Sequence, residues 1–203
     1  MRRRLFKNLI TAPCTEPVSE ATHLFEAAGE ALRGAIAQRL GRSLAIREVD
    51  AGSCNGCELE IHALGNAFYD VERFGIRFVA SPRHADVLLV TGPVTRNMRE
   101  ALERTWAATP APKWVVAAGD CAAGCGVFAD SYACVGAVSK VIPVDLVIRG
   151  CPPTPTDLLQ GFLWLLGGAP VTPSSARTLT ATAAQAIPAD EVLAKVRAEL
   201  RRR

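Results

Sequence analysis

Short apolar runs alternate with longer stretches of helical periodicity through the middle of the chain. The apolar runs are closed by Gly, Pro or Ser, and they occupy residues 44–49, 76–80, 87–91, 114–118 and 146–148. Their hydrophobicity is nearly continuous, which is typical of parallel strands buried on both faces of a sheet. Helical spacing of apolar residues follows in residues 58–69, 96–107 and 156–166. This alternation predicts an α/β fold.

Two extensions flank this central region. Residues 1–43 form an N-terminal extension in which residues 21–40 have the apolar spacing of a helix. Residues 168–203 are first rich in Gly, Ala, Pro, Ser and Thr and then form an amphipathic segment with an acidic start and a basic end. A chain of 203 residues, 49% of them hydrophobic, is sufficient for one domain. We therefore expect a domain at 44–167, a helical docking extension before it, and a linker with a short helix after it.

Charge and hydropathy exclude two classes of protein. The net charge of +3 is small, and the positive residues are concentrated at the two ends of the chain, so we expect no nucleic-acid partner. The most apolar stretch, residues 158–166, is far shorter than the ~20 residues that cross a bilayer. We therefore expect no membrane span.

The first ten residues are basic and partly apolar. Arg2, Arg3 and Arg4 resemble the start of a signal peptide, but Thr11 and Pro13 interrupt the apolar region that should follow, so secretion is not expected. This amphipathic segment can rest on anionic lipid or against a membrane subunit, or it is a solvated, disordered start. The seven cysteines are an odd number, which metal ligation in a reducing compartment explains better than disulfides. We expect a peripheral protein on the cytoplasmic side of the membrane.

Four cysteines follow the ends of predicted strands. Cys54 and Cys57 form a Cys-x2-Cys pair after the first strand, Cys121 follows the strand at 114–118, and Cys151 follows the strand at 146–148. The carboxyl ends of parallel strands meet at one edge of an open α/β sheet, where ligands bind. Glycines beside these cysteines let the main chain approach a bound group closely. The four thiols are therefore expected to converge.

The spacing of the cysteines leaves their chemistry open. Zinc sites and thioredoxin-like redox pairs also use Cys-x2-Cys. Zinc usually takes a second closely spaced pair, whereas Cys121 and Cys151 are isolated in the sequence. From spacing alone an iron-sulfur cluster is favoured over zinc, and over cysteines that are redox-active or merely buried.

Five ordered motifs in this region resemble a known family. They are GSCNGCELE at 52–60, SPRHAD at 81–86, TGPVTRNM at 91–98, IPVD at 142–145 and GCPPTP at 150–155. Together they resemble the small subunit of membrane-bound, energy-converting nickel-iron hydrogenases of the formate hydrogenlyase type. That group is homologous to the 20 kDa (B) subunit of respiratory complex I. The resemblance covers residues 44–166 without a large gap.

The resemblance implies a fold, a cofactor and a ligand set. It implies a flavodoxin-like open parallel sheet with helices on both faces, holding one 4Fe-4S cluster through Cys54, Cys57, Cys121 and Cys151. Complex I B subunits have adjacent cysteines in the first motif, whereas residues 55 and 56 separate them here, as in the hydrogenase branch.

The implied function is electron transfer inside an oxidoreductase complex. Electrons would pass between a ferredoxin-like iron-sulfur subunit and the nickel-iron site of a separate large subunit, with membrane subunits as further partners. The alternatives are a complex I-like or hydrogenase-related quinone-linked subunit, whose large partner lacks nickel, and a zinc-bound structural scaffold. In each case the chain itself is a non-catalytic subunit.

Other residues near the cysteine motifs have open roles. Glu60 is a candidate proton relay because it follows Cys57 by three residues at a predicted helix start, with Glu58 as a second candidate. The alternative for Glu60 is an acid that simply complements the helix dipole. Cys125 lies at a position that is commonly glycine in the family, and we interpret it as a structural or free thiol, with cluster ligation or redox sensitivity as the alternative. Cys134 is expected to be a small buried side chain.

Overall fold

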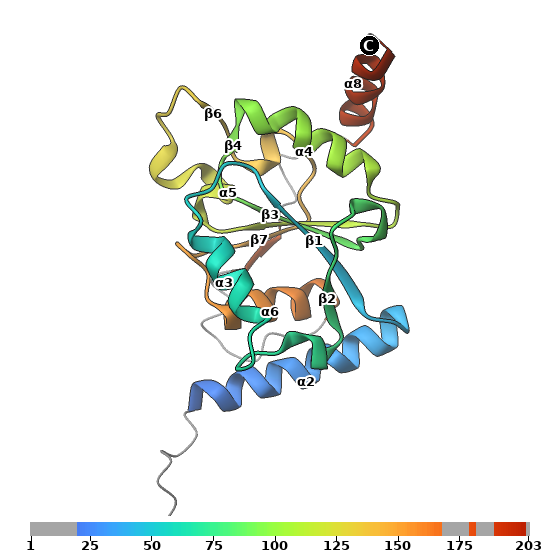
Figure 1. The fold of residues 1–203 in the computed structure, drawn as a ribbon, viewed down its shortest axis with the longest axis vertical. Coiled ribbons are helices and arrows are strands. Elements are labelled where there is room, and N and C mark those ends of the chain that lie inside the picture. Colours follow the sequence, from blue (N-terminus) through green and yellow to red (C-terminus); the bar gives the residue numbers. More distant parts are fainter. Residues whose placement is uncertain (1–19, 168–178, 182–188, 202–203) are drawn as a thin grey trace, which may run out of the picture.

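In the described part of the chain, the main sheet has six strands; Figure 1 shows how the helices are arranged around it. The structure is a computed structural model that describes residues 20–167, 179–181 and 189–201. The strands of this sheet lie in the order β2-β1-β3-β5-β7-β8. Their bounds are β1 Leu44–Asp50, β2 Ile76–Phe78, β3 Val87–Thr91, β5 Trp114–Ala118, β7 Leu146–Ile148 and β8 Leu179–Ala181.

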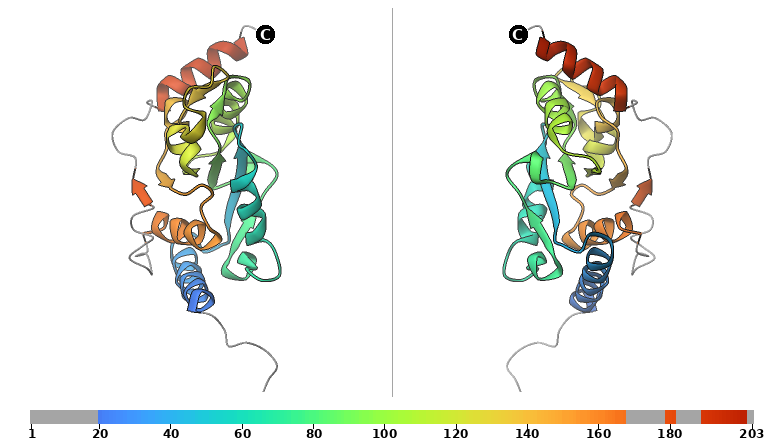
Figure 2. Two further views of the ribbon diagram at one scale, coloured as in Figure 1. Left: turned by 90° about the vertical axis from the view of Figure 1, so that its left-hand side faces the viewer. Right: turned by 90° about the vertical axis from the view of Figure 1, so that its right-hand side faces the viewer.

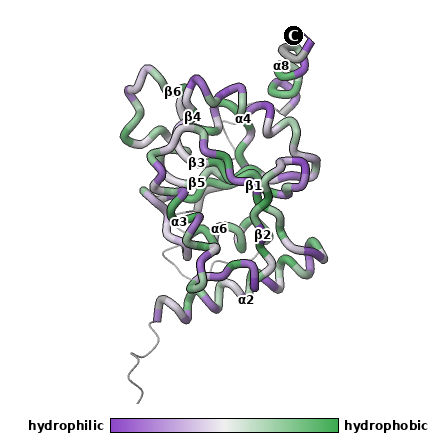
Figure 3. Tube along the Cα trace, viewed as in Figure 1, coloured by the Kyte–Doolittle hydropathy of each residue, from purple (hydrophilic) through white to green (hydrophobic). Residues whose placement is uncertain are grey.

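The first five strands pair in parallel, and β8 pairs antiparallel with β7. Counted along the chain, the parallel strands have the order 2-1-3-4-5, which is the flavodoxin-like arrangement. All five residues of β3 are buried because this strand lies in the middle of the sheet with helices on both sides. In Figure 3 the hydrophobic strands accordingly lie at the centre of the molecule. The predicted fold class is confirmed.

Helices cover both faces of the sheet (Figures 1 and 2). Each face has its own core cluster, because successive residues of β3 and β5 point to opposite sides. One face carries α2 (Glu20–Leu40), α3 (Gly56–Leu64) and α6 (Pro155–Leu165). The other face carries α4 (Arg96–Ala108), α5 (Asp120–Gly124) and α8 (Ala189–Arg201).

Short elements complete the described part of the chain. A two-stranded antiparallel sheet pairs β4 (Val94–Thr95) with β6 (Cys134–Gly136). The 3-10 helices are η1 Val71–Phe74, η2 Pro82–His84, η3 Gly126–Phe128 and η4 Val138–Lys140. No helix in the described ranges is long and apolar enough to cross a membrane.

The helix predicted in the N-terminal extension packs directly on the central region. Phe25, Ala28, Leu32 and Ile36 of α2 are buried in the same core cluster as β1, β3 and α6. These residues recur every three or four positions, so they form one apolar stripe along the helix. This part of the extension therefore shares its core with the sheet.

The C-terminal helix is held against α4 by apolar and charged contacts. Val192 and Val196 are buried, and the Lys195 ammonium lies 2.5 Å from a carboxylate oxygen of Glu103, which is only 2% exposed. Arg99 forms an ion pair with the same oxygen at 3.1 Å. Glu103 therefore links the two helices on this face of the sheet.

Some predicted boundaries were wrong. The helix expected at 58–69 ends at Leu64, because Gly65 follows and the side chain of Asn66 accepts hydrogen bonds from the backbone N–H groups of Phe68 and Tyr69. The strand expected at 76–80 ends at Phe78. Strands β4, β6 and β8 were not predicted, and β8 lies within the segment expected to be a linker.

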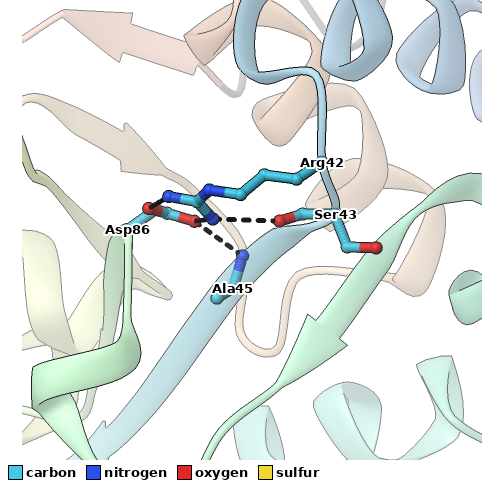
Figure 4. Close-up of polar contacts among 4 residues, drawn as sticks. All are labelled: Arg42, Ser43, Ala45 and Asp86. Atoms are coloured by element: carbon cyan, nitrogen blue, oxygen red, sulfur yellow. Dashed lines mark hydrogen bonds and ion pairs between the residues drawn. The ribbon is translucent and has the colours of Figure 1, made fainter.

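A bidentate ion pair fastens the start of β1 to the start of β3 (Figure 4). The two terminal nitrogens of Arg42 donate to the two carboxylate oxygens of Asp86 at 2.7 and 2.6 Å. The backbone N–H of Ala45 donates to the same carboxylate at 3.0 Å. Asp86 is 8% exposed, and burial raises its pKa, but these hydrogen bonds and the charges of Arg42 and Arg77 outweigh burial and lower the pKa below its ordinary value.

Asp86→Asn is expected to reduce the free energy of unfolding at neutral pH by about 1–2 kcal/mol, because the charge-assisted hydrogen bonds are lost. The folded-state pKa is depressed, so this stabilisation is present above the ordinary Asp pKa and disappears as the pH falls through the lower folded-state value. Urea unfolding of the unaltered chain and of Asp86→Asn across this acidic range should show that the difference between their free energies of unfolding decreases as the pH falls. The exposed pair Arg33 and Glu30 provides the control, because Glu30→Gln should change little at any pH. If Asp86→Asn lost the same free energy of unfolding at every pH, the ionisation of Asp86 would not be coupled to folding and this prediction would be wrong.

Candidate metal centre

The four cysteines predicted as ligands line one cavity at the carboxyl edge of the sheet. Its volume is about 120 Å³, and Cys54, Cys57, Cys121 and Cys151 all contribute to its wall. The remaining lining residues are Ser53, Gly56, Gly92, Asp120, Gly150 and Pro152. The lining residues lie in the segments that directly follow β1, β3, β5 and β7, including the first turns of α3 and α5. The predicted convergence of the cysteine loops is therefore seen in the fold.

The four thiols are close enough to influence one another electrostatically. Burial raises the pKa of Cys57 to about 12, and the neighbouring Glu58 and the other three thiols contribute to the rise. Burial also raises the pKa of Cys121. The nearby Cys151 and Cys54 raise this pKa further, and a backbone hydrogen bond from Val127 lowers it. A site that holds these sulfurs as thiolates needs a positively charged group to offset their charge.

The loop that carries Cys54 is organised by hydrogen bonds from Asp50. One carboxylate oxygen of Asp50 accepts from the backbone N–H groups of Gly52 and Ser53, both at 2.7 Å. The hydroxyl of Ser53 then accepts from the backbone N–H of Asn55 at 3.0 Å. Asn55 has φ of 71°, in the left-handed region, and α3 begins at the next residue. Cys54 therefore precedes the helix, and Cys57 lies in its first turn.

Two glycines leave space for the sulfurs. Gly119 has φ of +95°, and a Cβ atom there would lie 2.7 Å from the Sγ atom of Cys57. Gly126 has φ of +48°, and a Cβ atom there would lie 3.0 Å from the Sγ atom of Cys121. Both the backbone conformation and the close approach favour glycine at these positions.

The loop that carries Cys151 is tied to the loop that carries Cys121. The backbone N–H of Asp120 donates to the carbonyl of Gly150 at 2.8 Å, and the backbone N–H of Gly150 donates to the Asp120 carboxylate at 3.2 Å. The peptide bond between Cys151 and Pro152 is cis. A capping box between Thr154 and Asp157 then starts α6. The loops after β5 and β7 are thus coupled at the cavity.

The cavity is enclosed by the protein on one side and reaches the surface on the other. Cys121 is buried and Cys57 is partly buried, whereas Cys54 and Cys151 are exposed. In the described part of the chain, no three His, Cys, Asp or Glu side chains are grouped closely enough to hold one metal ion. The sulfurs instead surround a space roughly ten times the ~10–15 Å³ that a water-sized particle needs. The site therefore fits a group of several atoms, as the 4Fe-4S expectation requires.

The acidic residues of α3 differ in their surroundings. Glu60 is half-buried, does not line the cavity, and makes no hydrogen bond or ion pair with any described residue. Glu58 is 7% exposed, and one of its carboxylate oxygens accepts from the Ser53 hydroxyl at 2.6 Å. Its other oxygen is buried without a hydrogen-bond partner among the described residues. The structure thus brings Glu58, rather than Glu60, into direct contact with the loop of Cys54.

The remaining cysteines do not join this set. Cys125 is buried outside the cavity lining, and its backbone N–H donates to the carbonyl of Cys121 at 2.8 Å. Cys134 was expected to be buried but is partly exposed in β6. Cys14 lies outside the described residues.

The support given by Asp50 and Ser53 was not predicted from the sequence. An Asp two residues before a Gly-Ser pair is a sequence signal for a turn in which the carboxylate accepts backbone hydrogen bonds. That signal was present at residues 50–53. It identifies a turn but not the ligand loop that the turn supports.

Comparison with known proteins shows the family to which the chain is similar. The family description "NADH ubiquinone oxidoreductase, 20 Kd subunit" matches residues 54–165, which include all four cysteines. Formate hydrogenlyase subunit 7 of Escherichia coli K12 is 46% identical over 136 residues, which are 67% of this chain and 53% of that protein. The chain thus spans about half the length of that relative.

Two further proteins extend the comparison to membrane complexes. The probable membrane-bound hydrogenase subunit mbhJ of Pyrococcus furiosus is 46% identical over 127 residues, covering 63% of this chain and 76% of that protein. A chain in the structure of the membrane-bound sulfane sulfur reductase, an archaeal respiratory membrane complex, matches with a TM-score of 0.57 and 36% identity. That match covers 67% of this chain and 74% of the other. The predicted resemblance is confirmed, and the chain belongs to the 20 kDa subunit family of NADH ubiquinone oxidoreductase.

Proposed function

We propose that this chain is an electron-transfer subunit that holds one 4Fe-4S cluster through Cys54, Cys57, Cys121 and Cys151. The observation that carries the proposal is that these four cysteines, distant in sequence, line one cavity of about 120 Å³. Gly119 and Gly126 leave room for two of the sulfurs, because a Cβ atom there would lie 2.7 Å from the Sγ atom of Cys57 or 3.0 Å from that of Cys121. Cysteine thiolates are the usual ligands of such clusters.

A bound 4Fe-4S cluster supplies one-electron transfer. The residues of the chain position the sulfurs and control their surroundings. Asp50 fixes the loop of Cys54, Asp120 couples the loops of Cys121 and Cys151, and the backbone of Val127 donates a hydrogen bond to the Cys121 sulfur. Backbone hydrogen bonds to ligand sulfurs and partial burial are two means by which a protein sets a cluster potential.

The proposed partners are the other subunits of a membrane-bound oxidoreductase. They are a hydrogenase-type large subunit with a nickel-iron site, a ferredoxin-like iron-sulfur subunit, and membrane subunits. The names of the relatives support this assignment, since they include formate hydrogenlyase subunit 7 and a membrane-bound hydrogenase subunit. The chain would lie peripherally on the cytoplasmic side, and its N-terminal extension would dock on a membrane subunit or on lipid.

A second candidate is a quinone-linked subunit of a complex I-like enzyme, which the description of the family supports. The separation of Cys54 from Cys57 favours the hydrogenase branch. The assembled complex, purified from its native membranes through a tag on this chain, should contain nickel and reduce a dye with hydrogen. A complex without nickel that reduces quinone would replace the first candidate by the second. Zinc without iron would instead support a structural scaffold.

We propose Glu60 as a proton relay near the cluster, because it is half-buried in α3 three residues after Cys57. In the assembled complex, Glu60→Gln is expected to lower hydrogen turnover by at least about tenfold. The spectrum of the cluster should be unchanged, since Glu60 does not line the cavity. The exposed Glu72 gives a matched control, as Glu72→Gln should retain turnover. Full turnover in Glu60→Gln would reject this role and direct the same test to Glu58.

A further inference from the structure

Another concavity lies at the amino ends of the parallel strands, whereas the cysteines lie at the carboxyl ends. Its volume is about 250 Å³, and its lining residues are Arg42, Arg77, Arg83, His84, Ala85, Asp86 and Pro110. They precede or begin β1, β2, β3 and β5, so they gather at the amino ends of the parallel strands. Three arginines and a histidine therefore surround one space, which we name the basic pocket.

The charge of the basic pocket is only partly balanced from within. Asp86 is the one acidic residue among the described residues that line the pocket, and both carboxylate oxygens of Asp86 accept from Arg42. Arg77 is near enough to lower the pKa of Asp86. Neither Arg77 nor Arg83 forms a salt bridge with a carboxylate in the described ranges. After Arg42 and Asp86 cancel, two guanidinium charges remain at the pocket.

The positions of these two arginines are set by separate elements. Arg77 lies on β2, the edge strand of the sheet, and is exposed. Arg83 lies in η2, where Pro82 occupies the first turn and the Ser81 hydroxyl accepts from the backbone N–H of Arg83. Arg42 lines the same pocket and is held there by its two hydrogen bonds to Asp86 (Figure 4). The pocket thus combines donors from three chain segments on a fixed framework.

We propose that the basic pocket binds a phosphate group. Guanidinium groups present paired N–H donors that match the oxygens of a phosphate, and Arg77 and Arg83 supply two charges for a dianion. His84 adds an imidazole donor to the same wall. The Asp86 carboxylate opposes an anion, but its ion pair with Arg42 offsets that charge. The phosphate is either free in solution or part of a phospholipid headgroup.

The test uses the full chain and inorganic phosphate as the probe. Binding is followed by NMR of backbone amides at constant ionic strength, with chloride as the competing anion. Saturable shifts are expected at residues of the basic pocket, and Arg77→Gln/Arg83→Gln should weaken binding by roughly tenfold or more. Arg77→Lys/Arg83→Lys keeps the charge without the paired donors and should bind with intermediate affinity.

The matched control changes the same amount of charge elsewhere. Arg33→Gln/Arg197→Gln removes two exposed arginines from α2 and α8, outside the pocket, and should bind phosphate as the unaltered chain does. Thermal unfolding of each variant verifies that it is folded. Equal weakening in both double variants, or displacement of phosphate by an equal concentration of chloride, would overturn the proposal.

Vesicles distinguish the two sources of phosphate. The chain and its variants are sedimented with vesicles of phosphatidylcholine alone and of phosphatidylcholine and phosphatidylglycerol in equal parts. Weaker retention of Arg77→Gln/Arg83→Gln than of the control on the anionic vesicles would identify a lipid headgroup as the source. Equal retention together with pocket-specific phosphate binding would identify a soluble phosphate. All variants keep the basic N-terminus, so its contribution cancels.

Discussion

Cys57→Ser is expected to abolish cluster binding while leaving the fold intact. Cys57 lies in the first turn of α3 and lines the cavity with the other three cysteines, so its loss removes one of four proposed ligands. Serine is nearly isosteric but is a poor ligand for iron-sulfur clusters, which are held by thiolates. The iron content and visible absorbance of the anaerobically purified protein should fall to less than about a tenth of their original values.

Cys125→Ser provides the matched control for this prediction. Cys125 is only four residues from Cys121 and is buried, but it does not line the cavity. Its replacement should preserve the iron content and the visible spectrum. Circular dichroism and thermal unfolding of both variants separate ligand loss from misfolding. If Cys125→Ser lost the cluster and Cys57→Ser retained it, the ligand set would be wrong.

Gly119→Ala is expected to impair the same site without removing any ligand. The added Cβ atom would lie 2.7 Å from the Sγ atom of Cys57, and the alanine would have to keep φ of +95°. That backbone conformation alone costs about 1–3 kcal/mol for a non-glycine residue. Either the sulfur or the β5–α5 turn must therefore move. We expect the iron content to fall severalfold, with the cluster more easily lost on dilution or exposure to air.

The control for Gly119 is a glycine in the same region with free space around it. A Cβ atom at Gly124 would meet no atom within 4 Å, and Gly124 is the last residue of α5. Gly124→Ala should therefore keep the cluster and the stability of the protein. Iron content and the rate of bleaching in air measure both variants. Equal behaviour of the two alanine variants would show that contact with Cys57 is unimportant.

The parallel sheet could be predicted from the sequence because its strands are buried on both faces. Such strands have nearly continuous apolar residues, as in β3, which are visible without knowledge of the neighbours. The strands β4 and β8 have only two and three residues, and β8 lies in a segment rich in small residues. These strands form by pairing with β6 and β7, and the periodicity of the sequence does not reveal such pairing.

The convergence of the cysteines could be predicted for a related reason. Each ligand loop follows a parallel strand, and such loops meet at one edge of the sheet. The contacts that hold these loops could not be predicted from the sequence. One example is the close approach of Gly119 to Cys57, which lie 62 positions apart in the chain. The burial of Glu58 was also not evident, since helical spacing alone does not reveal which face of α3 meets the loop of Cys54.

The most direct test of the proposed function is to determine the metal and sulfide content of the anaerobically purified chain together with its electron paramagnetic resonance after reduction. The 4Fe-4S assignment predicts a brown protein with about four iron and four acid-labile sulfide per chain and a paramagnetic signal on reduction. The signal should be absent from Cys57→Ser and present in Cys125→Ser. A colourless protein that contains zinc, with neither iron nor a signal on reduction, would contradict it.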